Sequence, residues 1–284
     1  MKIVECPRDA MQGLHEFVPT SLKVKYLQTL LAVGFDTLDF GSFVSPKAIP
    51  QMRDTADVLA QLNLEETSTK LLAIVANLRG AEEAVNHDSI RYLGFPLSLS
   101  EEFQKRNTNK SIAAALDEVA QMQELCLKHQ KELVLYLSMG FGNPYGEAWT
   151  PELAGEMTQK LDALQINIIS LSDTIGVSTP ESIQQLFTTL IPAFPHIVFG
   201  AHLHTTPSSW REKVEAAYSS GCRRMDGALK GFGGCPMAKN ELVGNMPTEK
   251  MIAYFQEKDV PLNLNQEALQ TALRLVPEVF HSSL

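Results

Sequence analysis

Basic clusters and long apolar runs are both absent from this sequence. Its 24 Lys and Arg residues are outnumbered by 33 Asp and Glu, which gives a net charge of −9 over 284 residues. Proteins that bind nucleic acid neutralise phosphates with clustered Lys and Arg, so we expect no nucleic-acid partner. A membrane-spanning helix needs about 20 consecutive apolar residues, and the apolar runs of this chain are much shorter. We therefore expect no membrane association.

Cysteine is scarce, and the signature motifs of several common classes are missing. Four cysteines, none in a C-x-x-C pair, are too few for a disulfide scaffold and do not indicate a thiolate zinc site. There is no G-x-G-x-x-G after the first strand-like run and no G-x-x-x-x-G-K-[ST], which argues against dinucleotide and P-loop binding. We see no signal or transit peptide and no C-terminal S-K-L. A reducing, cytoplasmic location is the expectation.

The chain instead contains a regular alternation of strand-like and helix-like runs. Hydrophobic residues make up 44% of it, enough for a sizeable core. The predicted strands span residues 2–6, 37–40, 71–75, 90–95, 133–137, 166–171, 197–202 and 223–228. Helical spacing recurs between them. Eight such repeats in 284 residues predict an α/β fold, a (β/α)8 TIM barrel. An open doubly wound sheet is the alternative.

Domain and helix boundaries follow from local signals. No linker or low-complexity stretch divides the chain, so we expect one domain over 1–284, with the barrel over about 1–250 and a short C-terminal helical segment over about 251–284. Gly34 predicts the end of an early helix. Thr-Pro pairs at 150–151, 179–180 and 206–207 predict three helix starts, because Thr caps free N–H groups and Pro fits the first helical position.

Polar residues follow several of the predicted strands, where the catalytic residues of a TIM barrel gather. Arg8 and Asp9 follow the first strand, Asp39 lies near the end of the second, and Asp173 follows the sixth. A buried carboxylate needs a cation or hydrogen-bond donors around it, and Arg8 is a candidate partner for Asp39. A surface ion pair, a hydrogen-bonded turn or a loop cap would explain the same residues without catalysis.

The seventh predicted strand ends in His202-Leu203-His204. Residues i and i+2 of a strand point to the same side, so both imidazoles can face the barrel mouth and reach one metal ion. With Asp9 and Asn245 they form a candidate set of two nitrogen and two oxygen ligands. This set suits Mg²⁺, Mn²⁺ or another divalent ion in an octahedral site. It also contains the two-His-one-carboxylate triad of non-haem iron oxygenases, and ligand type alone leaves both open.

A glycine-rich segment follows the eighth predicted strand. Three glycines lie between residues 231 and 234, directly before Cys235. This composition predicts a pliable loop that can close over a ligand. Cys235 by itself is equally well explained as an inert loop residue.

Together these motifs resemble the 3-hydroxy-3-methylglutaryl-CoA lyase family, within the wider group of metal-dependent lyase and aldolase TIM barrels. The resemblance runs in order from residue 2 to about 250. Its motifs are P-R-D at 7–9 with Gln12, S-F-V-S-P-K at 42–47 with P-Q-M at 50–52, S-D-T-I-G-V at 172–177, H-x-H at 202–204, G-x-G-G-C-P at 231–236 and G-N at 244–245. R-D with H-x-H marks the wider group, whereas S-F-V-S-P-K and G-G-C-P are more specific to the lyase branch.

The resemblance implies a carbon–carbon lyase that cleaves 3-hydroxy-3-methylglutaryl-CoA, or a close 3-hydroxyacyl-CoA, to acetyl-CoA and acetoacetate by a retro-Claisen mechanism. The implied residues are, for catalysis, Arg8, Asp9, Asp39, His202 and Cys235; for substrate, Gln12, Ser42, Asn107, Asp173 and Thr174; and for the metal, Asp9, His202, His204 and Asn245. Arg8 would stabilise the enolate oxygen, Asp9 or His202 would handle the hydroxyl proton, and Cys235 would help to protonate the product. The resemblance further implies Mg²⁺ or Mn²⁺, a homodimer and a place in leucine degradation.

Four places depart from the family pattern. Asp39 stands where the family usually has Glu, and 205–210 replaces the usual Asp-Thr-Tyr-Gly. The stretch between Cys235 and Asn245 is one residue longer than usual, and 13–16 lacks the usual Lys. The three changes other than Asp39 border the predicted pocket mouth, so a related 3-hydroxyacyl-CoA is an alternative substrate.

Two other functions are alternatives to the lyase. A related aldolase or Claisen-type synthase would use the same metal site, although such synthases usually carry extra C-terminal domains. A barrel without activity, acting as a binding protein, would be expected to have lost a metal ligand, and all four candidates are present.

Overall fold

The structure, a computed structural model, describes residues 1–234 and 243–280. Its centre is a closed barrel of parallel strands in the order β1-β2-β3-β4-β5-β6-β7-β9. These strands are β1 (Lys2–Glu5), β2 (Thr37–Ser42), β3 (Lys70–Ile74), β4 (Ile90–Ser98), β5 (Glu132–Ser138), β6 (Ile168–Ser172), β7 (Val198–His202) and β9 (Arg224–Gly227). Because β9 pairs with both β7 and β1, the sheet closes on itself. The predicted TIM barrel is confirmed, and the open doubly wound sheet was wrong.

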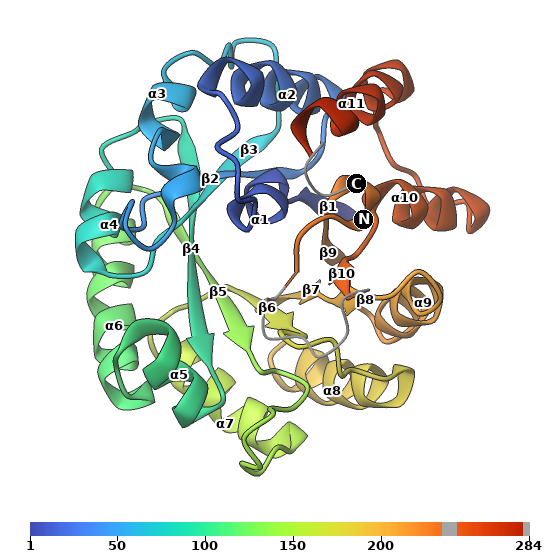
Figure 1. Cartoon of the computed structure of the whole chain (residues 1–284). Helices are drawn as coiled ribbons and strands as arrows, with labels where there is room; N and C mark the ends of the chain where they lie inside the picture. The colour runs from blue at the N-terminus through green and yellow to red at the C-terminus, as the bar shows by residue number, and fades with distance from the viewer. Residues whose placement is uncertain (235–242, 281–284) are drawn as a thin grey trace.

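Helices surround the barrel on its outside, except for the short α1, which lies inside this ring beside β1 (Figure 1). They are α1 (Pro7–Gln12), α2 (Thr20–Val33), α3 (Thr55–Leu59), α4 (Leu78–Ala84), α5 (Glu101–Thr108), α6 (Ile112–Lys128), α7 (Pro151–Ala163), α8 (Pro180–Ala193), α9 (Trp210–Ser219), α10 (Thr248–Glu257) and α11 (Gln266–Val279), with the 3₁₀ turns η1 (Pro50–Met52) and η2 (Leu229–Gly231). Within the described ranges, none of the helices is both long and apolar enough to cross a membrane.

The eight predicted strands are present, with shifted ends. β2 continues to Ser42 and β4 to Ser98, whereas β6 begins at Ile168. A further short strand, β8 (His204–Thr205), pairs antiparallel with β10 (Gly244–Asn245) above the barrel. The sequence did not predict this pair. It corrects one expectation, because the two histidines of H-x-H belong to different strands: β7 ends at His202, and His204 lies on β8.

Most of the predicted helix boundaries are found. Gly34 ends α2 in the left-handed conformation at φ 83°, which glycine adopts without strain. Thr150 caps α7 by accepting from the Leu153 N–H at 3.3 Å. Thr179 caps α8 in a capping box with Ser182.

The third Thr-Pro pair was wrong as a helix start. Helix α9 begins at Trp210, three residues after Pro207. The hydroxyl of Thr206 instead accepts from the Ser209 N–H at 3.3 Å, while the Ser209 hydroxyl accepts from the Thr206 N–H at 2.9 Å. The pair therefore closes a turn between β8 and α9.

Among the residues that the structure describes, buried apolar side chains form two clusters, one between the strands and the helices and one inside the barrel. The inner cluster contains Leu72, Ile74, Tyr92, Val134, Tyr136 and Ile168. Because side chains of a strand alternate between the two faces of the sheet, the same strands supply both clusters. The inner cluster fills part of the barrel interior.

Helices α10 and α11 form the C-terminal extension, and α11 lies beside α2 (Figure 1). Phe280, directly after α11, stacks on Phe232 with 4.5 Å between ring centroids and meets Tyr26 edge-on at 6.2 Å. At the start of α10, the Thr248 hydroxyl donates to the fully buried Glu5 of β1 at 2.5 Å. These contacts fasten the extension to the barrel.

Candidate active site

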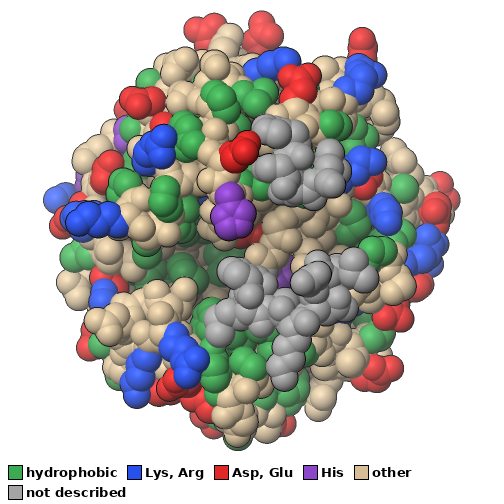
Figure 2. Space-filling view, in the orientation of Figure 1, with side chains coloured by type: hydrophobic (Ala, Val, Ile, Leu, Met, Phe, Trp, Pro, Cys, Tyr) green, Lys and Arg blue, Asp and Glu red, His purple; other side chains and the backbone are tan. Residues whose placement is uncertain are grey.

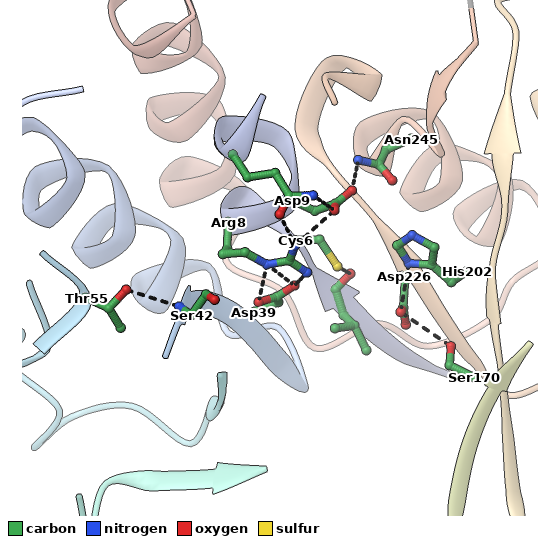
Figure 3. Close-up of polar contacts among 12 residues, drawn as sticks. Cys6, Arg8, Asp9, Asp39, Ser42, Thr55, Ser170, His202, Asp226 and Asn245 are labelled. Atoms are coloured by element: carbon green, nitrogen blue, oxygen red, sulfur yellow. Dashed lines mark hydrogen bonds and ion pairs between the residues drawn. The ribbon is translucent and has the colours of Figure 1, made fainter. Parts of the chain in front are cut away.

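The predicted site residues come from both ends of the sequence and converge (Figure 3). Arg8 and Asp9 lie on α1, directly after β1, and Asp39 lies on β2. His202 ends β7 and Asn245 ends β10. Helix α1 starts with a proline at its first position, where a missing N–H costs nothing. Because α1 begins so soon after β1, its side chains Arg8 and Asp9 are held above the end of the barrel.

Arg8 and Asp39 form a buried ion pair. Nε of Arg8 donates to both carboxylate oxygens of Asp39 at 3.1 Å, and Nη2 donates to Oδ2 at 2.5 Å. Nη1 donates to Asp9 Oδ1 at 3.1 Å and to Gln12 Oε1 at 2.9 Å. Asp39 is only 1% exposed and Arg8 only 7%. Asp39 therefore has the cationic partner that the sequence suggested for it.

This pair fixes a positive charge in the site. Burial raises the pKa of Asp39 to about 6, although the neighbouring Arg8 opposes the shift. Burial also works against the charge on Arg8, but the charges of Asp39 and Asp9 outweigh it and hold the pKa of Arg8 above its usual value. The Arg8 guanidinium is thus charged and oriented before any substrate binds.

Asp9, His202 and His204 form a cluster that could hold a metal ion. One ligand atom from each lies within 4.8 Å of the others. Asn245 adjoins the cluster, because its Nδ2 donates to Asp9 Oδ2 at 2.7 Å and to the carbonyl of Phe232 at 2.9 Å. Burial alone would raise the pKa of Asp9, but Arg8 and His202 hold it below its usual value. The cluster therefore contains a charged carboxylate.

His204 has the geometry of a metal ligand. Its Nδ1 lies 3.0 Å from the carbonyl of Thr174, which can only accept, so Nδ1 carries the proton. Nε2 is buried and has no hydrogen-bond partner among the described residues. Burial and the nearby His202 lower the pKa of His204. A neutral imidazole with a buried, unpartnered nitrogen aimed into an Asp–His cluster fits a divalent cation.

Behind His202 lies a carboxylate that the sequence analysis missed, Asp226 on β9. His202 Nδ1 lies 3.2 Å from Asp226 Oδ2, and Arg224 Nη1 donates to Asp226 Oδ1 at 3.1 Å. Burial lowers the pKa of His202, but the hydrogen bond and charge of Asp226, with Asp9, raise it overall. The signal was present, because Arg224 and Asp226 alternate on a barrel strand that is otherwise apolar.

A cavity of about 490 Å³ opens beside the cluster. Arg8, Asp9, His202 and His204 line it, as do three of the residues predicted to contact substrate: Gln12, Asn107 and Thr174. Ser138, Ser172 and Tyr136 add hydroxyl groups to the lining. In the orientation of Figure 2 the surface is hollowed near its centre, with hydrophobic side chains along part of the hollow.

Ser42, also predicted to contact substrate, does not line this cavity. It is 2% exposed, and its N–H donates to Thr55 Oγ1 at 3.1 Å. Its hydroxyl accepts from the Val44 N–H at 3.2 Å. Ser42 therefore shapes the turn after β2 rather than facing the cavity.

Asp173 is likewise buried away from the cavity. Its carboxylate accepts from the Val177 N–H at 2.8 Å, from the Ser178 hydroxyl at 2.5 Å and from Lys213 Nζ at 2.9 Å. These bonds hold the loop after β6, which carries Thr174 to the cavity. Cys235 lies outside the described residues.

The family of the chain follows from comparison with known proteins. The HMGL-like family model matches residues 2–276. The chain belongs to the HMGL-like family. It is 30% identical to a hydroxymethylglutaryl-CoA lyase of Bacillus subtilis, over 96% of this chain and 90% of that protein. The resemblance inferred from the motifs is confirmed.

Solved structures of HMGL-like relatives have the same fold. The HMG-CoA lyase of Brucella melitensis superposes with a TM-score of 0.91 at 27% identity, covering 98% of both chains. An HMG-CoA lyase from Acinetobacter baumannii, in complex with coenzyme A and 3-methylmalate, has a TM-score of 0.90 at 28% identity and covers 99% of this chain and 91% of that one. HMG-CoA lyases are carbon–carbon lyases that depend on a divalent metal, and the Asp9–His202–His204 cluster is a possible site for it.

Proposed function

We propose that this protein is a divalent-metal-dependent lyase that cleaves 3-hydroxy-3-methylglutaryl-CoA to acetyl-CoA and acetoacetate. The observation that carries the proposal is the convergence of Asp9, His202 and His204 beside the fixed guanidinium of Arg8 in one cavity. Membership of the HMGL-like family supports it. The coenzyme A in the structure of the Acinetobacter relative supports an acyl-CoA substrate.

The reaction breaks the bond between C2 and C3 of the acyl chain. The tertiary hydroxyl at C3 loses its proton, and its oxygen becomes the ketone oxygen of acetoacetate. The electron pair of the broken bond passes to the thioester as an enolate, which takes up one proton at C2 and becomes acetyl-CoA. The site must therefore accept a proton from the hydroxyl, stabilise negative charge on the thioester oxygen and supply a proton to carbon.

The residues of the cluster would hold the metal. Asp9, His202 and His204 would bind through Oδ, Nε2 and Nε2, and Asn245 through its amide oxygen. Oxygen and nitrogen ligands without thiolate favour Mg²⁺ or Mn²⁺. When bound, the cation supplies a positive charge that makes the substrate hydroxyl more acidic.

Arg8 would stabilise the developing enolate. Three of its hydrogen bonds go to Asp39, so its plane is fixed before substrate binds. Asp39 thus acts by orienting Arg8. Asp9 or His202, which adjoin the same space, would accept the hydroxyl proton.

The remaining cavity residues would bind the acyl group. Gln12, Asn107 and Thr174 line the cavity and can donate hydrogen bonds to carboxylate or carbonyl oxygens. Ser42 and Asp173 would act indirectly, by holding the turns after β2 and β6. We retain from the resemblance the proposal that Cys235 helps to protonate the product.

Three finer proposals concern the setting of the enzyme. A homodimer and a role in leucine degradation are carried over from the family resemblance, and a cytoplasmic location is carried over from the cysteine content and N-terminal sequence. Analytical ultracentrifugation checks the first: a sedimentation mass twice that of the chain supports the dimer, and a monomer mass contradicts it.

Substitution of His204 tests whether turnover and metal binding depend on the same cluster. We expect His204→Ala to lose both turnover and Mn²⁺ binding, measured by product release and by electron paramagnetic resonance of free Mn²⁺. His129→Ala, at the distant end of α6, is the matched control and should retain both. Wild-type turnover in His204→Ala would contradict the proposed site.

A further inference from the structure

A buried lysine of α9, Lys213, contacts the backbone of one residue of the metal cluster. Its Nζ donates to the carbonyl of His204 at 2.8 Å and to Asp173 Oδ2 at 2.9 Å. Lys213 is 4% exposed and Asp173 is 1% exposed. Lysine is seldom buried to this extent unless its charge is paired. One side chain therefore ties α9 both to β8 and to the loop after β6.

Asp173 leads to a second contact with the same histidine. Its Oδ1 accepts from the N–H groups of Val177 at 2.8 Å and Ser178 at 3.1 Å, which closes the loop after β6. The next residue in this loop, Thr174, offers its carbonyl to Nδ1 of His204 at 3.0 Å. The buried ion pair therefore reaches His204 at two points, directly at its backbone carbonyl and through Thr174 at its ring.

His204 needs this support because of the strand on which it lies. Strand β8 has two residues and pairs with β10, which is equally short. A two-stranded ribbon is only marginally stable by itself. His202, in contrast, ends β7, which pairs with β6 and β9 in the closed barrel. The barrel sheet thus fixes His202, whereas the position of His204 depends on contacts from outside its own strand pair.

We propose that Lys213 is a positioning residue for the metal ligand His204. Its two hydrogen bonds hold the β8 backbone and the loop whose carbonyl accepts from the His204 ring, and together they aim Nε2 of His204 into the metal cluster. The inference rests on the proposed function, because it takes His204 to bind the metal. Lys213 is not among the described residues that line the cavity, so it acts through His204.

Charge and position predict opposite effects of Lys213 on metal binding. As a cation beside His204, Lys213 repels a divalent ion, so its removal would strengthen metal binding if charge alone mattered. As a positioning residue it keeps a ligand in place, and the loss of such a contact behind a ligand weakens metal affinity about 10–100-fold. The direction of the change therefore distinguishes the two effects.

Lys213→Met tests the proposal, because it removes the charge and the donors at similar side-chain length. Electron paramagnetic resonance of free Mn²⁺, with substrate absent, measures the metal affinity. We expect the variant to bind Mn²⁺ about 10–100-fold more weakly than the wild type. Lys23→Met is the matched control and should bind Mn²⁺ like the wild type. Lys23 is also buried, and it also donates to one carboxylate, Asp54, and to one backbone carbonyl, that of Gln51.

A double variant separates positioning from folding. Lys213→Met leaves Asp173 buried without its cation, which destabilises the fold. In Lys213→Met/Asp173→Asn, the amide oxygen can still accept from the Val177 and Ser178 N–H groups, and the amide nitrogen can donate to the Ser178 hydroxyl. We expect the urea unfolding midpoint to recover while Mn²⁺ binding remains weak. Recovery of both would mean that Lys213 only neutralises Asp173, and would overturn the inference.

Cobalt(II) reports the geometry of its ligands, because its visible absorption bands depend on their number and arrangement. A merely structural role of Lys213 would leave these bands unchanged. We expect the spectrum of Co²⁺-loaded Lys213→Met to differ from that of the wild type in band position or intensity, and the spectrum of Lys23→Met to match the wild type. Identical spectra for all three proteins would overturn the inference.

These measurements do not depend on turnover, so they separate the inference from the proposed reaction. If the wild type binds Mn²⁺ but cleaves no thioester, weaker binding by Lys213→Met still supports the inference, and only the proposed reaction fails. If the wild type cleaves 3-hydroxy-3-methylglutaryl-CoA but Lys213→Met binds Mn²⁺ as tightly or more tightly, the reaction stands and the inference is overturned. An equal loss of affinity in Lys23→Met would also overturn it, because general destabilisation would then explain the effect.

Discussion

Arg8 lines the cavity with the positive charge that is proposed to face the enolate, and the buried Asp39 holds it in place. Asp39 is a methylene shorter than the Glu usual in the family, yet it accepts three hydrogen bonds from Arg8. The pair is almost fully buried, so removal of one partner affects both chemistry and folding. These two effects can be separated by mutation.

Arg8→Ala should lower kcat about 10²–10³-fold, because a charge-stabilising group is lost. It should also reduce the free energy of unfolding by about 3–5 kcal/mol, since Asp39 is left buried without its cation. The double variant Arg8→Ala/Asp39→Asn should recover much of the stability but none of the activity. Steady-state kinetics and urea denaturation measure the two. Recovery of activity in the double variant would rule out a chemical role for Arg8.

Asp226→Asn should weaken divalent metal binding about 10–100-fold, because Asp226 orients His202 through Nδ1. The substitution keeps the shape but removes the charge. Calorimetric titration with Mn²⁺ gives the affinity. Asp117→Asn, on the exposed face of α6, is the control, and equal affinity in the two variants would mean that Asp226 has no positioning role.

At the scale of elements, the strand–helix alternation was visible in the sequence and the connections above the barrel were not. Hydrophobic periodicity identifies strands because the buried positions of a strand are visible in its own residues. The β8–β10 pair joins Thr205 to Gly244 and His204 to Asn245. These residues lie far apart in the sequence, so no local pattern encodes the pairing. Asp173 shows the same limit: its position after a strand was correct, but Lys213 and Ser178 turn it away from the cavity.

The junction of β1 with α10 should make stability depend on pH. Burial raises the pKa of Glu5 from 4.5 to about 8. The folded state therefore favours the protonated carboxyl. The contribution of protonated Glu5 to the free energy of unfolding is fully present below pH 4.5 and is lost as pH rises through about 8. At about 1.4 kcal/mol per pKa unit, the change is on the order of several kcal/mol.

Glu5→Gln should remove most of that pH dependence. Urea denaturation at pH 5, 7 and 9 should show the free energy of unfolding of the wild type falling as pH rises, and that of the variant changing less. The stability of the variant relative to wild type should therefore be greatest at pH 9. Glu212→Gln, exposed on α9, is the control. Parallel curves for wild type and Glu5→Gln would contradict the buried, protonated state of Glu5.

The packing of Phe280, directly after α11, against α2 and the segment after η2 should contribute strongly to stability. Phe280 is 1% exposed and packs between Phe232 and Tyr26. Phe280→Ala should lower the free energy of unfolding by about 3–5 kcal/mol, and Phe280→Leu by less. Denaturation in urea measures both, and a loss below about 1 kcal/mol for Phe280→Ala would show that α11 is only loosely attached.

At the scale of the whole molecule, the closed barrel explains why residues from positions 8 to 245 share one site. Parallel strands place all their carboxyl ends on the same face, so a correct fold prediction already brings Arg8, Asp9 and His202 together. The sequence could not predict the protonation state or tautomer of each side chain. The tautomer of His204 depends on the Thr174 carbonyl, and the proton on Glu5 depends on complete burial. Both are properties of the packed structure.

Product release from the metal-stripped protein tests the central claim most directly. The protein is incubated with 3-hydroxy-3-methylglutaryl-CoA, with and without Mg²⁺ or Mn²⁺, and acetyl-CoA and acetoacetate are quantified. We predict equimolar release of both products only when metal is present. If neither product forms while Mn²⁺ is shown to be bound, the barrel and its cluster stand but the proposed reaction is wrong.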